Sequence, residues 1–436
     1  MTSGTKESPA VQRILSLHFD TPESERLATY TASGGYSACR RAFARPPEDV
    51  TEEVKKSGLR GRGGAGFPAG VKWGFIPKNT ERPVYLCINA DESEPGTFKD
   101  RYIMERDPHM LLEGILITCW AIRSHDAYIY IRGEFEDARR VLQAAIDEAY
   151  AAGHLGANPC GSGWRIDVTI HRGAGAYICG EETGLLESLE GKKGYPRIKP
   201  PFPAVVGLFQ SPTIINNVET IASVPWILEH GGEAYARIGV GKSTGTKLWC
   251  ISGHVARPGV YETPLGVPFR TLLEEYAGGM RHPDRPLKAV IPGGSSVPVL
   301  TASEALGVNM DYESLGQLGT MLGSAGVMVI EEGTCMVWAL AVITRFYAEE
   351  SCGQCTPCRE GTSWVNDIMW RLERGGATPE DIALVHNLCD NMIGKTICVL
   401  ADAMVMPAKS FMKKFKPEFD AHIAAGRCPL PQPVRD

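Results

Sequence analysis

The stretch Val84-Tyr-Leu-Cys-Ile88 is a continuous run of apolar and aromatic residues, and it decides the fold class. A run of this length is typical of a strand that is buried on both faces of a sheet. The sequence predicts two further strands, at 127–131 and 165–170, and helices at 111–123 and 135–151. Strands that alternate with helices of this length predict an α/β layer built on a largely parallel sheet.

Outward from this layer, the chain divides into four predicted parts. Residues 1–48 have weak periodicity and are expected to form an N-terminal arm, whereas 49–244 form the α/β domain. Residues 245–331 alternate short strands with turns and predict a small α+β unit, and 332–436 show helical patterns that predict a four-helix bundle. The other predicted elements are helices at 49–57, 218–229, 269–276, 335–350, 359–374, 379–392 and 404–424, and strands at 247–252, 259–262, 289–291 and 327–330.

Composition excludes several classes of protein. The 436 residues exceed one ordinary domain of about 150 residues, and 43% hydrophobic with 22% charged residues are the proportions of a soluble globular protein. A net charge of −6 gives no general electrostatic footprint for nucleic acid or an anionic membrane. We expect no signal peptide, transit peptide or membrane span. Thirteen cysteines are too few for a disulfide scaffold, which indicates a reducing compartment.

The cysteines cluster near the C-terminus. In Cys352-Gly-Gln-Cys355-Thr-Pro-Cys358, two-residue spacings let successive thiolates surround one metal centre, and a remote fourth cysteine suits a single [4Fe–4S] cluster. We expect Cys398 in that place because it lies in a loop, whereas the competing Cys389 lies in a helical stretch. A zinc site and unligated buried thiols are the alternatives. The scattered cysteines, among them Cys335 and Cys428, are expected to be packing residues.

The glycine-rich loop, Gly58-Leu-Arg-Gly-Arg-Gly-Gly-Ala-Gly-Phe-Pro-Ala-Gly70, contains a formal Gly-x-Gly-x-x-Gly pattern. That pattern alone is weak, and here a predicted helix precedes it instead of a strand. Five glycines within 61–70, together with the cations Arg62 and Lys72, nevertheless make a suitable cradle for a nucleotide or flavin phosphate. The alternative is a flexible loop.

Two acidic loops follow predicted strands. Asn89-Ala-Asp-Glu-Ser-Glu-Pro-Gly96 follows the first strand, and Arg172-Gly-Ala-Gly-Ala-Tyr-Ile-Cys-Gly-Glu-Glu182 links the third strand to a helix that ends near Gly191. Carboxylates here suit ribose hydroxyls, a carboxamide or the hydrogen-bonding edge of a flavin, but Glu181 and Glu182 could simply be partners of the helix dipole. Three phenylalanines could stack on an aromatic ligand or belong to the core, namely Phe67, Phe75 and Phe202.

Taken together, these residues resemble the NADH-binding flavoprotein subunits of respiratory complex I, the proton-pumping NADH:quinone oxidoreductase. The combination of motifs is specific and covers most of the chain; one conservative departure is Gly184, where the family usually has alanine. The motifs are GLRGRGGAGFPAGVKW (58–73), NADESEPGTFKDR (89–101), HRGAGAYICGEET (171–183), KPPFPA (199–204), NNVET (216–220) and ESCGQCTPCREG (350–361).

The resemblance implies a Rossmann-like FMN domain, a ubiquitin-like β-grasp (SLBB-like) domain over 245–331 and a helical carrier of a [4Fe–4S] cluster. It implies that NADH lies over the flavin, with adenine near Phe67, Phe75 and Phe202, and that the cluster ligands are Cys352, Cys355, Cys358 and Cys398. The other implied FMN and dinucleotide contacts are Gly61, Arg62, Gly63, Gly64, Gly66, Lys72, Asn89, Asp91, Glu92, Glu94, Tyr177, Gly180, Glu181, Glu182, Lys199, Asn216 and Asn217.

The resemblance further implies an NADH dehydrogenase, an oxidoreductase of the translocase class. A hydride passes from NADH to FMN and single electrons pass to the cluster, with no residue as acid or base and with Glu94 and Glu182 as positioning groups. The implied partners are a thioredoxin-like [2Fe–2S] subunit and the large iron–sulfur subunit, which hold the chain at the cytoplasmic face of a bacterial membrane. The alternative is the flavoprotein subunit of an NAD-linked hydrogenase or formate dehydrogenase; the chain length and the absence of an N-terminal fusion domain favour complex I.

Overall fold

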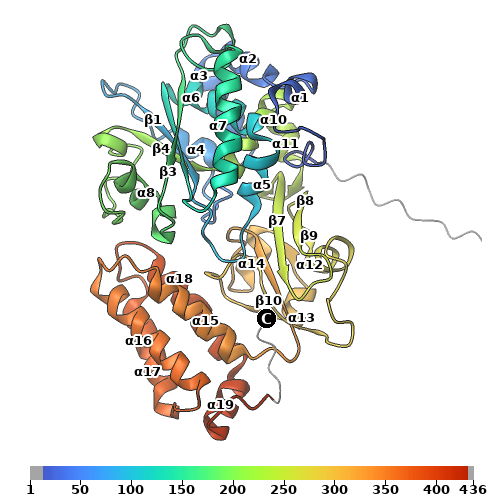
Figure 1. Cartoon of the computed structure of the whole chain (residues 1–436), viewed down its shortest axis with the longest axis vertical. Helices are drawn as coiled ribbons and strands as arrows, with labels where there is room; N and C mark the ends of the chain where they lie inside the picture. Colours follow the sequence, from blue (N-terminus) through green and yellow to red (C-terminus); the bar gives the residue numbers. More distant parts are fainter. Residues whose placement is uncertain (1–12, 431–436) are drawn as a thin grey trace, which may run out of the picture.

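A parallel four-stranded sheet forms the centre of the first part of the chain in the computed structural model, which describes residues 13–430 (Figure 1). All three strand pairings are parallel, and the chain winds outward from the first strand in both directions, as in doubly wound Rossmann-like sheets. The predicted α/β layer is therefore confirmed. In spatial order the strands are β3 (Asp167–Arg172), β2 (Asp126–Ile131), β1 (Tyr85–Ala90) and β4 (Thr213–Asn217).

Successive side chains of β1 pack into two different hydrophobic cores. Leu86 and Ile88 join a core with the helices that connect the strands, whereas Cys87 joins a second core that continues into the C-terminal helices. Burial on both faces explains why the sequence of β1 is continuously apolar and does not alternate. The helices of the first core are α5 (Lys99–Arg106), α6 (Pro108–Ile122), α7 (Glu136–Ala151), α9 (Val218–Ala222) and α10 (Val224–His230).

The predicted N-terminal arm is wrong for the described residues, because 13–48 contain two helices packed on the α/β layer. The buried carboxylate of Glu113 on α6 accepts hydrogen bonds from the Tyr30 hydroxyl and from the backbone N–H groups of Tyr36 and Cys39, at 2.5, 2.9 and 2.9 Å. These contacts come from a distant part of the chain, so local periodicity could not reveal them. The first helices are α1 (Leu27–Ala32), α2 (Ser37–Phe43) and α3 (Pro47–Lys56).

Other boundaries also differ from the prediction. The helix expected over 218–229 is two helices, α9 and α10, with Pro225 in the first turn of the second, and α11 (Gly232–Ala236) follows. Strand β4 and helix α5 were not predicted, because β4 is only five residues long and α5 is strongly polar.

The middle unit is a mixed five-stranded sheet with its own core. Strands β13 (Gly326–Glu331) and β7 (Thr246–Gly253) pair in parallel and the other pairings are antiparallel. The expected helix over 269–276 begins as α12 (Phe269–Thr271) and continues as a π-helix over Leu272–Tyr276. The remaining strands and helices are β8 (Gly259–Pro264), β10 (Leu287–Ile291), β11 (Leu300–Thr301), α13 (Ala302–Leu306) and α14 (Tyr312–Gln317), with the short pairs β5 (Gly239–Val240) with β6 (Ser243–Thr244) and β9 (Val267–Pro268) with β12 (Asn309–Met310).

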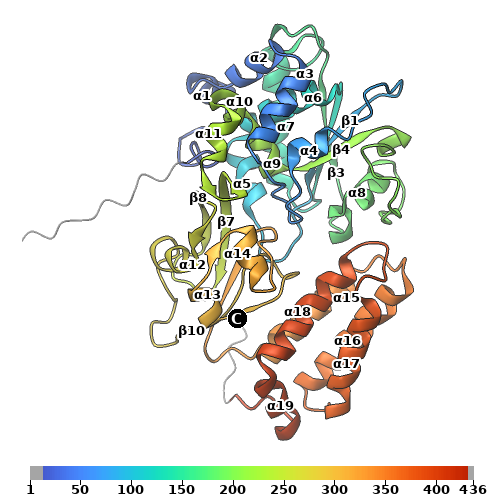
Figure 2. The same ribbon diagram turned by 180° about the vertical axis from the view of Figure 1, so that it is seen from behind.

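The C-terminal part is helical, as predicted, and lies beneath the sheet and beside the middle unit (Figures 1 and 2). The helix expected over 404–424 is two helices that meet at Phe415, so this part has five helices among the described residues. Within 13–430, none of the helices has the length and apolar character that crossing a bilayer requires. The five helices are α15 (Met336–Glu349), α16 (Thr356–Glu373), α17 (Pro379–Met392), α18 (Leu400–Lys414) and α19 (Lys416–Ala425).

Candidate functional site

The predicted site residues gather where the strand order reverses, at the carboxyl ends of β1 and β4. Asn89 on β1 is in register with Asn217 on β4, and its side-chain amide donates to the Gly180 carbonyl at 2.8 Å. Gly180 belongs to the loop that leads from β3 to α8 (Glu182–Leu189). In open α/β sheets, the crevice beyond the strand ends at such a reversal is the usual ligand site. Figure 2 shows α4 (Ala69–Trp73), which follows the glycine-rich loop, beside β4 and α8.

Backbone contacts close the glycine-rich loop against the end of β4. The Gly61 N–H donates to the Phe67 carbonyl at 2.8 Å. A Cβ on Gly63 would lie 3.0 Å from the Cβ of Asn217, so glycine permits this close approach. Gly64 adopts φ +135°, where a side chain is strained, yet no atom lies within 4 Å of its Cβ position. The loop thus presents open, unhindered backbone at the strand ends, which fits the approach of a phosphate.

The Arg62 side chain lies inside the fold, and its expected contact with a ligand stays a prediction. Its guanidinium is fully buried and donates to the Thr244 carbonyl at 2.7 Å and to the hydroxyls of Tyr235 and Tyr312 at 3.3 and 3.4 Å. These partners lie on α11, β6 and α14, so the cation points away from the open face of the loop. The alternating glycine pattern suggested a phosphate-facing arginine, but burial within the fold decides its direction.

Four charged residues form a cluster beside the loop, which we call the lysine–glutamate cluster (Lys72, Glu181, Glu182 and Lys199). The Lys72 ammonium lies 2.9 Å from Glu182, and the Lys199 ammonium lies 2.8 Å from Glu181 and 3.2 Å from Glu182. Although burial opposes it, the Lys72 and Lys199 cations hold the pKa of Glu182 below its ordinary value. Lys72, Glu182 and Lys199 are each 26% exposed, so the cluster is paired yet accessible.

Glu181 and Glu182 have separate roles in this cluster. Glu181 is the N-cap of α8, where its carboxylate accepts from the backbone N–H groups of Thr183 and Gly184 at 2.8 and 2.9 Å. Glu181 is therefore a partner of the helix end, which was the alternative for both glutamates. Glu182, in contrast, is paired only with the Lys72 and Lys199 cations among the described residues. A Cβ on Gly184 would lie 2.7 Å from the Ile178 carbonyl oxygen, so glycine lets α8 approach the preceding turn closely.

Asp91 supplies a carboxylate oxygen that has no partner. Its Oδ2 accepts from the Ser93 hydroxyl at 2.8 Å, whereas the buried Oδ1 has no hydrogen-bond partner. Burial raises the pKa of Asp91 to about 7. A Cβ on Gly180 would lie 3.2 Å from Oδ2, so the carboxylate faces the Gly180 turn closely. A buried acceptor without a donor at a strand-end crevice fits the N–H groups at the edge of a flavin.

The other two acidic residues of this loop hold structural elements together. Glu92 accepts from the backbone N–H groups of Lys99, Asp100 and Arg101 at 2.8, 2.9 and 3.1 Å, so its carboxylate caps the first turn of α5. Glu94 accepts from the Tyr177 hydroxyl at 2.7 Å and the Ser296 N–H at 2.8 Å. Burial raises the pKa of Glu94, and these hydrogen bonds counter the rise.

The three phenylalanines are exposed, as the stacking interpretation expects. Phe67, Phe75 and Phe202 are 47%, 52% and 58% exposed, so the alternative of core residues does not apply. The rings of Phe67 and Phe75 lie 5.9 Å apart at 47°. Exposed aromatic rings beside the lysine–glutamate cluster offer a surface for a planar ligand.

The helices α15, α16 and α18 lie below α8 (Figure 1), and the segment between α15 and α16, residues 350–355, is called the cysteine loop. The Tyr177 N–H donates to Glu350 at 3.0 Å, two residues before Cys352. Burial raises the pKa of Cys398 to about 12, and the negative charges of Cys358, Glu181 and Cys352 add to the rise. The loop before α18 thus brings Cys398 to the three closely spaced cysteines.

Donor chemistry and position favour Cys398 over Cys389. The Ile397 N–H, adjacent to Cys398, donates to the Cys355 sulfur at 3.3 Å. Cys389 lies inside α17 and is completely buried in the helical core. Two thiols before α16, the thiol of Cys358 in the first turn of α16 and that of Cys398 in the loop before α18 fit the ligand set of one iron–sulfur cluster.

A second charged group, the junction cluster (Lys99, Asp100, Glu219 and Lys247), was not predicted from the sequence. Glu219 at the start of α9 accepts from Lys247 on β7 at 2.5 Å and lies 2.9 Å from Lys99 on α5. Asn217 donates to Asp100 at 2.6 Å, which links this group to the end of β4. Three of these residues lie in two of the family motifs. Acidic and basic residues in shared motifs were the sequence signal that could have indicated this cluster.

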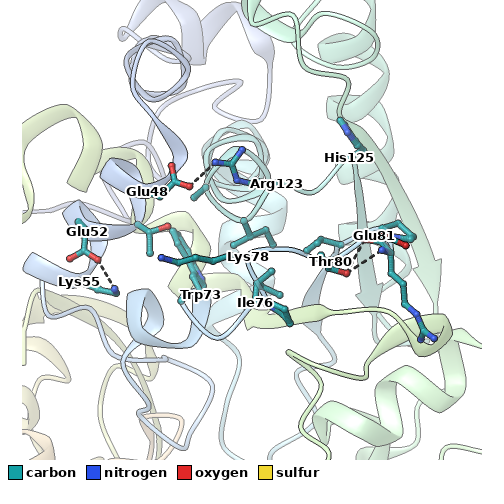
Figure 3. Close-up of a pocket in the computed structure, with 18 residues that line it drawn as sticks. Glu48, Glu52, Lys55, Trp73, Ile76, Lys78, Thr80, Glu81, Arg123 and His125 are labelled. Atoms are coloured by element: carbon teal, nitrogen blue, oxygen red, sulfur yellow. Dashed lines mark hydrogen bonds and ion pairs between the residues drawn. The ribbon is translucent and has the colours of Figure 1, made fainter.

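A cavity of about 500 Å³ lies apart from all of these residues (Figure 3). It is lined by α3, the segment after α4 and the α6–β2 turn, with ion pairs Glu48–Arg123 and Lys55–Glu52 at its edge. Of the predicted site residues, the flavin and dinucleotide contacts and the cluster cysteines all lie elsewhere. Its lining mixes three acidic with four basic side chains, so it has no strong charge of one sign.

Three family models match the chain. The Nuo51 FMN-binding domain matches residues 54–226, an SLBB domain matches 247–329, and the NADH-ubiquinone oxidoreductase-F iron-sulfur binding region matches 338–422. The first model contains the glycine-rich loop and the strand ends, and the third contains all four expected cluster cysteines.

Curated relatives match over almost the whole length. The chain is 53% identical to an F-subunit of the NADH-quinone oxidoreductase of Rhizobium meliloti, over 96% of this chain and 99% of that protein. It is 51% identical to the F-subunit of the NADH-quinone oxidoreductase of Mycobacterium tuberculosis, over 98% and 97%. Among solved structures, a chain of an NAD+-reducing [NiFe]-hydrogenase in the H2-reduced state has a TM-score of 0.83 at 34% identity, covering 95% of this chain and 67% of that chain.

Proposed function

This chain belongs to the family of NADH-quinone oxidoreductase F-subunits, and from that membership we propose which of its residues carry the family's chemistry and which partners it meets. The chain is an FMN-binding oxidoreductase subunit that takes electrons from NADH and carries a [4Fe–4S] cluster. The observation that carries this function is the similarity over 96% of the chain, because it spans both cofactor regions.

When bound, FMN takes the hydride of NADH as an electron pair, and the [4Fe–4S] cluster takes electrons singly. We assign the backbone of the glycine-rich loop, open at Gly64 and flanked by Gly61, Gly63 and Gly66, to the flavin phosphate. Asp91 offers its free oxygen to the polar edge of the flavin, and Asn89 holds the Gly180 turn in place. The additional predicted contacts, Asn216 and Asn217, lie at the end of β4.

The lysine–glutamate cluster and the exposed phenylalanines are assigned to the dinucleotide. Lys72 and Lys199 are paired but partly open, so they can turn toward the phosphates of NADH while Glu182 positions its polar groups. Phe67, Phe75 and Phe202 offer ring faces to adenine. None of these carboxylates is required as an acid or base, because a hydride carries its own electron pair and proton.

The Tyr177–Glu350 contact supports a route for electrons from the flavin region to the cysteines. It joins the turn at the flavin edge to the segment beside Cys352, and the Tyr177 ring lies 5.1 Å from that of Phe346 on α15. The two cofactor regions are thereby held in fixed, short separation, which a route for single electrons needs. We assign Cys352, Cys355, Cys358 and Cys398 as the cluster ligands.

The ligand assignment is tested by comparing Cys398→Ser with Cys389→Ser. In the purified full chain we expect Cys398→Ser to lose most of its four irons and its low-temperature EPR signal while FMN stays at one per chain. The Cys389→Ser chain should keep its iron and signal. Equal iron in both variants would contradict the assignment.

We propose that the partners are a thioredoxin-like [2Fe–2S] subunit and the large iron–sulfur subunit of complex I. With them, the chain is placed at the cytoplasmic face of a bacterial membrane, and 49–244, 245–331 and 332–436 act as the flavin, β-grasp and cluster-carrying parts. The second candidate, a flavoprotein subunit of an NAD-linked hydrogenase, is supported by the solved hydrogenase chain. Affinity purification from the source cells separates them: iron–sulfur and quinone-reducing partners support complex I, whereas a nickel–iron subunit overturns it.

A further inference from the structure

A second set of metal-binding side chains converges at the far end of the helical part, away from the cysteine loop. Cys335, His422 and Cys428 each offer one ligand atom, and these atoms all lie within 4.8 Å of one another. Within residues 13–430, this is the one group of three such residues that is compact enough for a single ion. The expectation that both cysteines are ordinary packing residues does not account for this convergence.

The fold brings these residues together for a clear reason. Helices α15 and α16 are antiparallel neighbours, so Cys335 before α15 and Glu373 at the end of α16 lie at the same end of the pair. Helix α19 packs across that end and carries His422, and the chain returns to it at Cys428. Figures 1 and 2 show α19 below the other helices, beside the segment that enters from the middle unit.

The distances among Cys335, His422 and Glu373 fit one face of a tetrahedron around a single ion, and the Cys428 sulfur lies within 4.8 Å of the ligand atoms of Cys335 and His422. The Cys335 sulfur lies 3.3 Å from His422 Nε2 and 3.8 Å from Glu373 Oε2, and His422 Nε2 lies 3.6 Å from Glu373 Oε2. Bonds of about 2.3 Å to sulfur and about 2.0 Å to nitrogen or oxygen give tetrahedral edges of about 3.3 to 3.8 Å. The three measured edges fall within this range.

The surroundings orient these side chains. His422 Nδ1 lies 2.8 Å from the Glu418 carbonyl oxygen, which accepts a hydrogen bond from it and leaves Nε2 free to face the sulfur. The Trp338 N–H donates to the Cys335 sulfur at 3.3 Å, which orients the sulfur. The side chains of His422 and Glu373 are only 1% and 4% exposed and Cys335 is buried, whereas Cys428 is partly exposed.

The backbone fixes the return of the chain to this point. A Cβ on Gly375 would lie 1.8 Å from the Gly426 carbonyl oxygen, so the turn after α16 and the turn after α19 approach as closely as only glycine allows. Both glycines also adopt positive φ, +82° and +58°. Cys428 is therefore held near Cys335 by the packing of two turns.

We propose that Cys335, His422 and Cys428, with Glu373 as fourth ligand, bind one zinc ion that fastens the C-terminal segment to the start of α15. Two thiolates and an imidazole are the ligands that zinc prefers, and a closed four-ligand set is typical of a structural site. The ion lies outside the electron route. It stabilises the junction at which the middle unit passes into the helical part.

The test is the metal content of the full chain, purified with FMN and cluster and without chelators. We expect about one zinc per chain by mass spectrometry of the elements, and a zinc-edge X-ray absorption spectrum with two sulfur and two nitrogen or oxygen neighbours. Cys428→Ser should lose at least 80% of the zinc and keep its iron and FMN. Cys160→Ser is the matched control, a partly exposed thiol that also contacts a cysteine and a histidine; its zinc should stay unchanged.

Three results would overturn the proposal. One is a wild-type chain that holds no zinc after incubation with equimolar zinc(II). Another is a shell of four sulfurs, which would place the ion at the cysteine loop, as would loss of zinc in Cys398→Ser alone. The third is a Cys335–Cys428 disulfide found by peptide mass spectrometry of the anaerobically purified chain. If Cys428→Ser does not fold, the absorption spectrum of the wild-type chain still decides.

Discussion

The junction cluster and the lysine–glutamate cluster contain the same kinds of side chain near the ends of the same parallel sheet, yet they differ in access to solvent. In the junction cluster, Glu219 and Lys247 are completely buried and Lys99 is 1% exposed. In the lysine–glutamate cluster, Lys72 and Glu182 are each 26% exposed. Fully buried charged side chains can interact only with one another, whereas partly exposed ion pairs can exchange a partner for a ligand.

The same comparison distinguishes carboxylates that join parts of the fold from carboxylates that are free to contact a ligand, although both kinds lie in the same set of motifs. Glu219 ties the first α/β unit to β7 of the middle unit through Lys247, and it accepts from the Leu248 N–H at 3.0 Å. Its position between two units leaves no room for a ligand. Asp91 lies on the same edge of the sheet and keeps one oxygen without a partner. The free oxygen of Asp91 can therefore accept from a ligand, whereas the oxygens of Glu219 are taken up by protein donors.

The largest effect should come from breaking the junction cluster with Glu219→Gln. Removing the carboxylate leaves Lys99 and Lys247 buried side by side, and loss of one partner from a buried pair costs about 3–5 kcal/mol. The free energy of unfolding in urea measures this loss. Glu274→Gln, which removes half of an exposed ion pair with Arg270, is the matched control and should change it by less than about 0.5 kcal/mol. Equal losses of stability in the two variants would contradict the distinction between buried and exposed charge pairs.

The next effect is the pH dependence that Asp91 imposes. Its pKa is about 7 in the folded chain because of burial, whereas an unfolded aspartate ionises near pH 4. The folded state therefore holds the proton more tightly, and the stability that Asp91 contributes falls as the pH rises from about 4 to 7. Asp91→Asn should flatten this slope and stabilise the FMN-free chain at pH 8 by up to about 4 kcal/mol.

FMN affinity is the second measurement for Asp91→Asn. A carboxylate has two acceptor oxygens whereas an amide has one, so the variant loses an acceptor for the flavin. We expect Asp91→Asn to bind FMN about tenfold more weakly by fluorescence titration, a difference of about 1.4 kcal/mol. An unchanged pH slope together with unchanged FMN affinity would show that Asp91 is an ordinary buried residue.

The smallest effect on stability should come from Glu182→Gln in the lysine–glutamate cluster. Its pairs are partly solvated, so the free energy of unfolding should fall by less than about 1 kcal/mol. NADH affinity should instead change, with KM raised about three- to tenfold while FMN content stays at one per chain. A large loss of stability without a change in KM would make this cluster structural, like the junction cluster.

Much of the fold could be predicted because its signals are local. The buried strand at the centre, the amphipathic helix α7 and the helical C-terminal part follow from residue pattern alone. Helices α1 and α2 could not be predicted in this way, since contacts with Glu113, some 75 residues away, hold them. The division of 218–229 and 404–424 into two helices each has a local signal that the prediction missed, because Pro225 and Pro417 lie in the first turn of the second helix of each pair.

The sequence predicted which residue types form the candidate site, but it predicted the directions of their side chains less well. The motifs located the glycine-rich loop, the acidic loops and the cysteines, because each chemistry needs particular residues at particular spacings. They could not show that Arg62 points into the interior or that Glu92 caps α5. A side chain's direction is set by the partners that the rest of the chain brings to it.

The sequence by itself determined the α/β class, the family resemblance and the thiols expected at the cluster, because these depend on composition, periodicity and spacing along the chain. Only the tertiary structure decided which charges are sealed and which are open, and which distant side chains meet. Lys247 reaches Glu219, and Cys335 reaches His422, across 28 and 87 positions of sequence. Contacts of that range arise from the packing of whole elements, so no local pattern encodes them.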